Sequence, residues 1–325
     1  MIQIIDFDSC PVNERNGTYG GMAGDKEGIT FQGEYWIIKY PKSTKGMRGD
    51  LISYMTSPLS EFIGSNIYDI LGYDVHETLL GIRNDKLIVA CKDFCVNEGA
   101  LREVRTLKNV YNTELSKRVE KSISSTSSSH IVDLQEMMLH FKYNPILSKI
   151  PDLKERFWNC VVVDILINNN DRNNGNWGIL YENKEYKLAP VFDNGAAFSN
   201  KYTDEKIADI LSNPERMRQS IMAASTVYGI ENRMLSAQEI LRVDNSDLRN
   251  ALKCNLEKIR KKMPEIKSFI YEIPEYFGEY PVCSNTRKEF YVKGMELRVE
   301  QLLEPALEMR NNYEKQTLRT MERCQ

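Results

Sequence analysis

Two polar segments of the chain place carboxylate and amide side chains in a fixed order. The first spans residues 170–176 (NDRNNGN) and the second spans residues 191–195 (VFDNG). A phosphoryl-transfer site needs a carboxylate that orients a hydroxyl, and oxygen ligands that hold Mg²⁺ on the nucleotide phosphates. Asp171, Asn176 and Asp193 supply these groups in that order. A solvated turn would explain the first segment alone, but it does not explain the second Asp.

The residues between the two segments predict a β-hairpin. Residues 177–182 and 185–192 are rich in aromatic and β-branched side chains, which suit a pleated surface. Residues 183–184 (NK) lie between them, and asparagine tolerates the positive φ of a tight turn. Such a hairpin brings Asn176 and Asp193 to the same open end.

The composition indicates a soluble globular protein from a reducing compartment. Hydrophobic residues make up 42% of the 325 positions, and the net charge of -3 provides no overall basic field for nucleic acid. An odd number of cysteines, seven, argues for reduced thiols, and the three histidines are too far apart in sequence to suggest a zinc site. We see no signal peptide and no long apolar stretch, so we expect a cytoplasmic protein without a membrane span.

The pattern along the chain predicts an α+β fold with two lobes. A small β-rich lobe would span residues 1–94, and a mostly helical lobe would span residues 95–325. Residues 35–40 and 87–90 have the composition of strands, and apolar residues from 59 to 71 keep helical spacing.

In the second lobe, a mostly buried helix over residues 155–167 would lead directly to Asp171. An amphipathic helix is expected over residues 296–311. The serine-rich residues 122–129 suggest a flexible loop, and the basic residues 258–262 suggest a solvated helix face.

Three features of the first lobe suit a nucleotide. Residues 17–26 are rich in glycine, which lets backbone N–H groups approach phosphates, although an ordinary turn would explain them nearly as well. Lys39 stands in an otherwise apolar strand, and a buried ammonium needs a partner such as Glu61. A solvent-facing lysine on an edge strand is the alternative. Ser57 would cap the helix that carries Glu61, and Gly72 would end it.

The succession of these features resembles the HipA-like serine/threonine kinases. That family has a bilobal kinase fold related to protein and phosphoinositide kinases. Residues 20–26 (GGMAGDK) look like its phosphate loop, and residues 189–193 (APVFD) look like its metal-binding segment. The resemblance covers roughly residues 15–200.

The resemblance implies a kinase that uses ATP and Mg²⁺ to phosphorylate Ser or Thr in a protein, and that also phosphorylates itself. Asp171, Lys39 and Glu61 would be the catalytic residues, with Asp171 as the base that orients the hydroxyl. Asn176 and Asp193 would bind the metal. The nucleotide would contact Gly20, Gly21, Met22, Ala23, Gly24, Lys39, Cys91, Lys92, Phe94 and Asp193.

Two positions depart from the family pattern. Asn173 stands where a histidine is common, and Gly21 stands where many members have an autophosphorylated serine. Thr18 and Tyr19 are hydroxyl groups close to that loop. The N-terminal extension of the longer toxin kinases is not evident, so we expect no nucleic-acid partner. The resemblance also implies release into host cells without a signal peptide.

Two other functions fit parts of the pattern. A phosphoinositide or small-molecule kinase could use the same fold, but a lipid headgroup would call for a basic cluster after Asp193, where Lys201 stands alone. A nucleotide-binding module without catalysis would be expected to lack Lys39, Asp171, Asn176 or Asp193, and all four are present. The sequence therefore favours catalysis, without identifying the acceptor or the oligomeric state.

Overall fold

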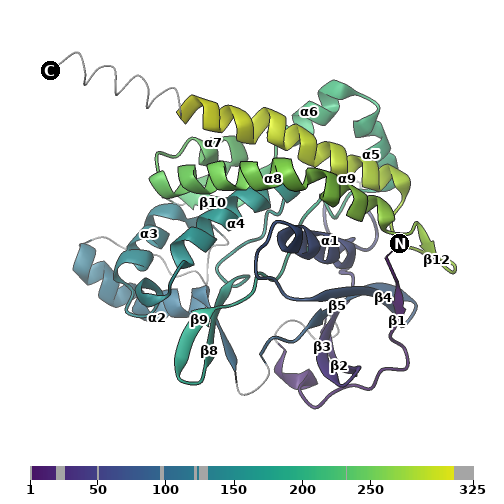
Figure 1. Ribbon diagram of the computed structural model, residues 1–325, viewed down its shortest axis with the longest axis horizontal. Coiled ribbons are helices and arrows are strands. Elements are labelled where there is room, and N and C mark those ends of the chain that lie inside the picture. The colour runs from purple at the N-terminus through teal and green to yellow at the C-terminus, as the bar shows by residue number, and fades with distance from the viewer. Residues whose placement is uncertain are drawn as a thin grey trace.

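The computed structural model describes residues 2–19, 26–49, 51–95, 99–120, 123, 131–231 and 233–310. The predicted phosphate-loop residues 20–24 lie outside these ranges, as does the serine-rich stretch apart from Ile123. Within the described ranges, a β-rich part and a larger helical part face each other (Figure 1).

A five-stranded sheet forms the β-rich part of the described chain. Its order is β1 (Ile5–Asp6), β4 (Thr78–Arg83), β5 (Lys86–Lys92), β3 (Glu34–Lys39) and β2 (Lys26–Phe31). β1 runs parallel to β4, and the other neighbours are antiparallel. Because β3 lies between β2 and β5, Lys39 is not on an edge strand. This excludes the alternative of an edge-strand lysine.

The helix α1 (Ser57–Ile70) packs against β4 and β5 and carries Glu61. We predicted Ser57 as its N-cap, but the N-cap is Thr56, whose side chain makes no capping hydrogen bond. The helix thus starts one residue earlier than predicted, a difference as small as that between common ways of assigning helix ends. Gly72 follows the helix with φ +80°, which glycine adopts without steric cost, as predicted.

The predicted hairpin is confirmed. It consists of β8 (Gly178–Glu182) and β9 (Glu185–Leu188), and residues 183–184 form the turn with φ values of 53° and 68°. The second strand is shorter than predicted, since it ends at Leu188 and not at Phe192. Pro190 explains the early end, because it has no N–H for a strand ladder.

The rest of the described chain is mostly helical, as predicted. Its helices are α2 (Val104–Val119), α3 (Leu134–Tyr143), α4 (Leu153–Ile167), α5 (Asp204–Leu211), α6 (Pro214–Met222), α7 (Ala237–Leu241), α8 (Ser246–Glu272) and α9 (Asn285–Arg298). Its other strands are β6 (Ala100–Glu103), β7 (Val132–Asp133), β10 (Ser225–Ile230), β11 (Arg233–Ser236), β12 (Tyr276–Phe277) and β13 (Tyr280–Pro281). The long helix α8 packs on α4, which leads into the first polar segment (Figure 1).

The first residue of the helix predicted over residues 296–311 was wrong. α9 begins at Asn285 and continues after Arg298 as a short π-helix, η3 (Val299–Leu303), before α-helical residues 304–310. Arg287 and Lys288 are buried in the first turn of α9. These buried basic residues interrupt the apolar pattern that marks a buried helix face. The first half of the helix could therefore not be recognised from the sequence.

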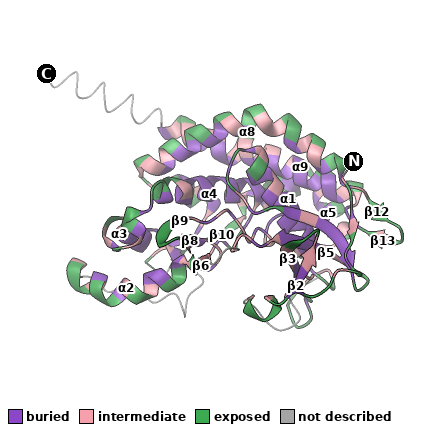
Figure 2. Cartoon of the chain, turned by 60° about the horizontal axis from the view of Figure 1, so that its bottom comes forward, coloured by how far each residue is buried: buried purple, intermediate pink, exposed green. Residues whose placement is uncertain are grey.

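Among the described residues, the larger of two clusters of buried apolar side chains is continuous through both parts of the structure. It includes Ile63 of α1, Leu80 of β4, Val162 of α4 and Leu252 of α8, each at most 1% exposed. Figure 2 shows how much of α1 and α4 is buried. A smaller cluster covers the opposite face of the sheet. The apolar core therefore extends past residue 94, where we placed the boundary between the lobes, and that boundary stays a prediction.

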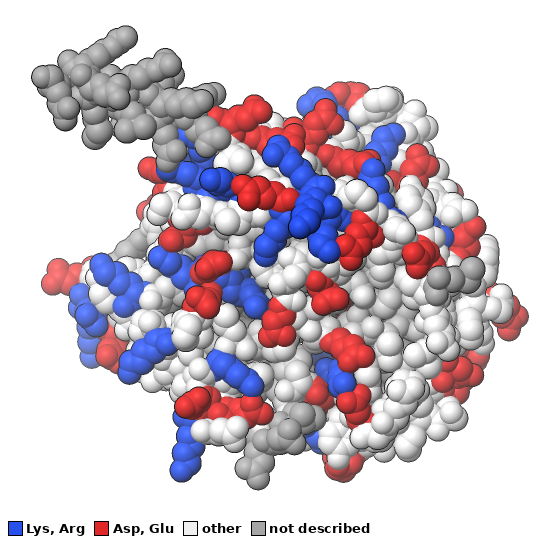
Figure 3. Space-filling view, viewed as in Figure 1, with Lys and Arg blue, Asp and Glu red and all other residues white. Residues whose placement is uncertain are grey.

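Charged residues of both signs share the face of the molecule shown in Figure 3, where a group of basic side chains lies over α8. In the basic residues 258–262, Arg260 pairs with Glu304 at 2.7 Å and Lys262 pairs with Glu265 at 2.6 Å. These partners fit a solvated helix face. Among the helices of the described ranges, none is both long and apolar enough to cross a lipid bilayer.

Candidate active site

Lys39, at the end of β3, faces two carboxylates. Its Nζ lies 3.2 Å from Oε2 of Glu61 and 3.0 Å from Oδ1 of Asp193. The Lys39 side chain is 19% exposed, and that of Glu61 is 1% exposed. A strand, a helix and the second polar segment, which are far apart in the sequence, therefore meet at one ammonium group.

The three charges hold one another in the ionised state. Burial by itself would lower the pKa of Lys39, but the carboxylates of Asp193 and Glu61 reverse this and raise that pKa. Burial would likewise raise the pKa values of Glu61 and Asp193, but the Lys39 ammonium lowers both below their usual range. The cluster thus carries one negative charge in excess, which favours binding of a cation beside it.

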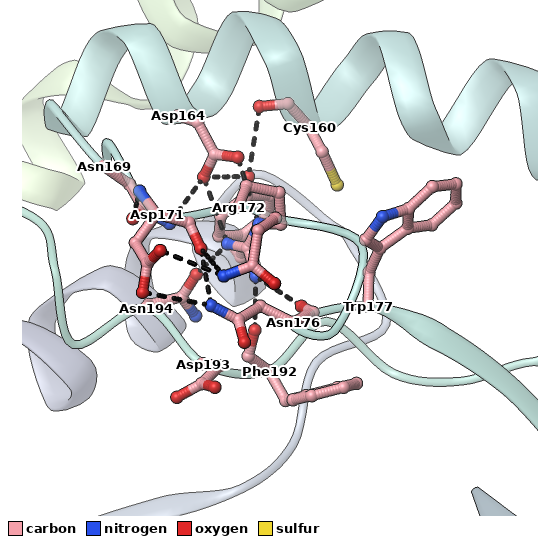
Figure 4. Close-up of polar contacts among 12 residues, drawn as sticks. Cys160, Asp164, Asn169, Asp171, Arg172, Asn176, Trp177, Phe192, Asp193 and Asn194 are labelled. Carbon is pink, nitrogen blue, oxygen red and sulfur yellow. Dashed lines mark hydrogen bonds and ion pairs between the residues drawn. The ribbon is translucent and has the colours of Figure 1, made fainter. Parts of the chain in front are cut away.

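Asp171 lies on the loop after α4 and is exposed. Its Oδ1 accepts a hydrogen bond from Asn173 Nδ2 at 2.9 Å, and its Oδ2 accepts one from Asn176 Nδ2 at 3.3 Å (Figure 4). The amide oxygen of Asn176 points to the side of Asp193 in this view. The loop thus presents a carboxylate and, next to it, an amide oxygen that is directed towards the second polar segment.

The buried Arg172 fastens the two polar segments together. Its Nε and Nη2 each lie 3.0 Å from the carboxylate of Asp164 in α4. Its Nη1 donates to the backbone carbonyl of Asn176 at 3.1 Å and to that of Phe192, and its Nη2 also donates to Oδ1 of Asn194. The open end of the hairpin is therefore organised around one guanidinium group.

Asp164 connects this guanidinium to further elements. Its Oδ1 accepts hydrogen bonds from Tyr68 of α1 and from Asn169, both at 3.0 Å. Burial alone would lower the pKa of Arg172, but the Asp164 carboxylate raises it well above its usual value. Helices α1 and α4 and the Asp171 loop thus share one buried ionic network.

From the sequence we predicted no role for Arg172 or Asp164. A signal for the pair was present, because Asp164 is an acid inside the apolar helix over residues 155–167. A buried carboxylate requires a cationic or hydrogen-bonding partner, and the nearest arginine beyond the helix is Arg172.

Removal of this guanidinium is expected to destabilise the fold strongly. In Arg172→Met, the buried Asp164 carboxylate loses its charge partner, which costs about 3–5 kcal/mol in comparable sites. Urea unfolding measures the loss. Arg218→Met is the matched control, because it breaks only an exposed ion pair with Glu215 and should leave the unfolding midpoint almost unchanged. Equal midpoints for the two variants would contradict a stabilising role of Arg172.

Of the residues predicted to contact the nucleotide, Cys91 and Lys92 end β5 and Phe94 follows it. Cys91 is buried, and the Lys92 ammonium is 2.7 Å from Glu34. The Phe94 ring lies 5.7 Å from the Phe192 ring, centroid to centroid. Of these three predicted residues, Phe94 thus directly contacts the second polar segment, whereas the side chain of Lys92 is engaged elsewhere.

The residues before the predicted phosphate loop are tied to the same segment. The Tyr19 hydroxyl donates to Oδ2 of Asp93 at 2.9 Å, and Nη1 of Arg15 lies 3.0 Å from the same oxygen. Residues 20–24, which follow directly, lie outside the described residues. The structure therefore fixes where that loop starts, next to the segment that joins the two parts of the chain.

The chain is similar to known kinases over nearly its whole length. It is 30% identical over 307 residues to the serine/threonine-protein kinase CtkA of Helicobacter pylori, covering 93% of this chain and 87% of that protein. The crystal structure of a Helicobacter pylori proinflammatory kinase CtkA matches with a TM-score of 0.81 at 27% identity, covering 96% of this chain and 99% of that one. No family model matches the sequence.

A more distant structure shares the fold. HipA of Shewanella oneidensis, solved with HipB and operator DNA, matches with a TM-score of 0.53 at 12% identity, covering 89% of this chain and 67% of that one. The predicted α+β kinase fold and the predicted resemblance are thereby confirmed. The chain is a serine/threonine protein kinase with a HipA-like fold, and it belongs to the family of CtkA.

Proposed function

We propose that this kinase transfers the γ-phosphoryl group of ATP, bound together with Mg²⁺, to a serine or threonine hydroxyl of a protein. The observation that carries the proposal is the convergence of Lys39, Asp193 and the Asp171 loop in one place. Lys39 provides a fixed positive charge for phosphate oxygens, and Asp171 provides an exposed carboxylate for a hydroxyl.

The donor atoms of the site fit Mg²⁺. This ion prefers carboxylate and amide oxygens, which Asp193 and Asn176 supply. Oδ1 of Asp193 pairs with Lys39, so Oδ2 is the oxygen that would bind a cation, and the lowered pKa keeps the group ionised. When bound, Mg²⁺ would offset the negative charge of the phosphates. Positioning and charge would supply most of the rate enhancement, as is usual in phosphoryl transfer.

Each side chain then has a distinct task. Asp171 orients the acceptor hydroxyl and takes its proton, and hydrogen bonds from Asn173 and Asn176 hold its carboxylate in place. Lys39 holds phosphate oxygens of the nucleotide, and Glu61 keeps Lys39 extended towards them. Among the predicted nucleotide contacts, residues 20–24, Cys91, Lys92 and Phe94 remain part of this proposal.

The proposal includes autophosphorylation and a protein acceptor. Thr18, an exposed hydroxyl close to the predicted phosphate loop, is the candidate site. A protein acceptor is favoured over a phosphoinositide or small molecule because the relative that is 30% identical is named a serine/threonine-protein kinase. Operator DNA and HipB accompany the distant HipA, and for this chain the expectation of no nucleic-acid partner stays a prediction. Cytoplasmic location and release into host cells also stay predictions.

Labelled ATP tests the proposal directly. The purified chain is incubated with γ-labelled ATP and Mg²⁺ and, in parallel reactions, with a generic protein acceptor, phosphoinositide vesicles or small hydroxyl compounds, and the labelled residues or molecules are identified. We expect label on Ser or Thr of the acceptor and of the chain itself, and none when a chelator replaces Mg²⁺. Label found only on added lipid or on a small molecule would favour the alternative acceptor. No transfer to any acceptor would contradict the proposed activity.

A further inference from the structure

His76, between α1 and β4, is attached to the second polar segment through its main chain. Its N–H donates to the carbonyl of Val191 at 3.1 Å, and Val75 forms a parallel bridge with the same residue. Asp193 follows Val191 by two positions. The backbone of His76 thus fixes the start of the segment that carries the proposed metal ligand.

The His76 side chain is directed to Glu61. Its Nε2 lies 2.9 Å from Oε1 of Glu61, and both residues are buried. A carboxylate can only accept, so Nε2 carries the hydrogen and donates it. Ser65 Oγ lies 3.0 Å from the same nitrogen and accepts a hydrogen bond from Asn194 Nδ2 at 3.0 Å. The imidazole is therefore held among groups that belong to α1 and to the second polar segment.

Glu61 depends on this contact for its orientation. Its Oε1 accepts the bond from His76 and one from the backbone N–H of Asp193 at 3.0 Å. Its Oε2 faces Lys39 at 3.2 Å but accepts no aligned hydrogen bond from any described residue. Charge attraction alone is weakly directional, so the donors at Oε1 determine how the carboxylate is turned.

We propose that His76 is a positioning residue for phosphoryl transfer, which turns the Glu61 carboxylate so that Lys39 is held at the nucleotide phosphates. This inference rests on the proposed function of the site. Through its backbone and its side chain, His76 links the segment that carries Asp193 to the partner of Lys39.

A metal ion is a less suitable explanation for this arrangement. Ligand atoms of Glu61, His76 and Cys91 lie within 4.8 Å of one another. A metal there would require the Cys91 thiolate, but burial raises the pKa of that thiol. It would also lie beside the Lys39 ammonium, which already binds Glu61. The hydrogen bond from the His76 imidazole to Glu61 accounts for the close approach of these two groups without this repulsion.

Three variants separate positioning from general stability. His76→Leu removes the donor, whereas His76→Gln retains an N–H that can reach the position of Nε2. His140→Leu is the matched control, because His140 is also a buried histidine but bonds with Asn112 and Asn144 in the helical part. For each variant, kcat, KM for ATP and KM for the protein acceptor are measured, together with the folded fraction.

We expect His76→Leu to lower kcat/KM for ATP by about 10-fold or more, since small misplacements of positioning groups have effects of this size. KM for the acceptor should stay unchanged, and His76→Gln should recover most of the activity. His140→Leu should lower activity only as far as it lowers the folded fraction. In a Glu61→Gln background, His76→Leu should add little, because the two side chains act as one unit.

Two results would overturn the inference. One is a His76→Leu variant whose loss of activity matches its loss of folded protein, as in His140→Leu. The other is a loss that is fully additive with Glu61→Gln. Either result, obtained with an active wild-type chain, leaves the proposed kinase activity standing. A wild-type chain that transfers no phosphate contradicts the proposed function itself, and the inference with it.

Discussion

The change Asp171→Asn should abolish phosphoryl transfer while the fold and ATP binding are retained. A general base contributes about 10²–10⁴-fold to the rate, and an amide cannot accept the proton. The side chain keeps its shape, and its remaining oxygen can still accept hydrogen bonds from Asn173 or Asn176. Single-turnover transfer of labelled phosphate measures the loss, and a binding titration measures the affinity for ATP.

Asp244→Asn is the control for this change. Asp244 lies before α8, its side chain is 99% exposed, and its partner Arg249 is 4.0 Å away. This variant should transfer phosphate at the wild-type rate. Undiminished transfer by Asp171→Asn would show that the base has been assigned to the wrong residue. A loss of ATP affinity in place of a loss of rate would give Asp171 a role in binding.

The change Asp193→Asn should remove the Mg²⁺-dependent part of ATP binding, and activity with it. Asp193 is the proposed metal ligand, and its carboxylate also holds Lys39 at 3.0 Å. A ligand at 100 times its Kd stabilises a protein by about 2.7 kcal/mol. We expect saturating ATP with Mg²⁺ to stabilise the wild-type chain by about this amount and the variant by much less. Thermal unfolding with ATP, with and without Mg²⁺, measures the difference.

The stability of Asp193→Asn without ATP shows whether the substitution harms the fold itself. Lys39 keeps Glu61 as a partner at 3.2 Å, so loss of the Asp193 charge does not leave a buried ammonium unpaired. The unliganded variant should therefore unfold cooperatively and remain folded at room temperature. Full Mg²⁺-dependent stabilisation by ATP in Asp193→Asn would exclude Asp193 as the metal ligand.

The parts of the site that depend on local sequence could be predicted. The turn at residues 183–184 and the strands on either side follow from residue type and alternation. The place of Asp171 follows from the end of an apolar helix, and the pairing of Lys39 with Glu61 follows from the need of a buried charge for a partner.

The parts that depend on packing across the chain could not be predicted. Arg172 reaches Asn194 and Phe192, and His76 reaches Glu61 and Val191, only after the sheet and the helices have assembled. Asp164 in its apolar helix points to Arg172 as a partner, but no local pattern indicates Asn194 or Phe192, and none singles out His76. Which groups a buried side chain meets is a property of the folded chain. For the same reason, the start of α9 was hidden by its buried basic residues.

The continuous apolar core has a consequence for cooperativity. Because Ile63 and Leu80 are buried in the same cluster as Val162 and Leu252, neither half of the chain encloses a complete core of its own. A fragment that ended at residue 94 would expose the apolar stripe of α1 to water and would tend to aggregate. The β-rich part and the helical part should therefore melt in a single transition, because each covers apolar surface of the other.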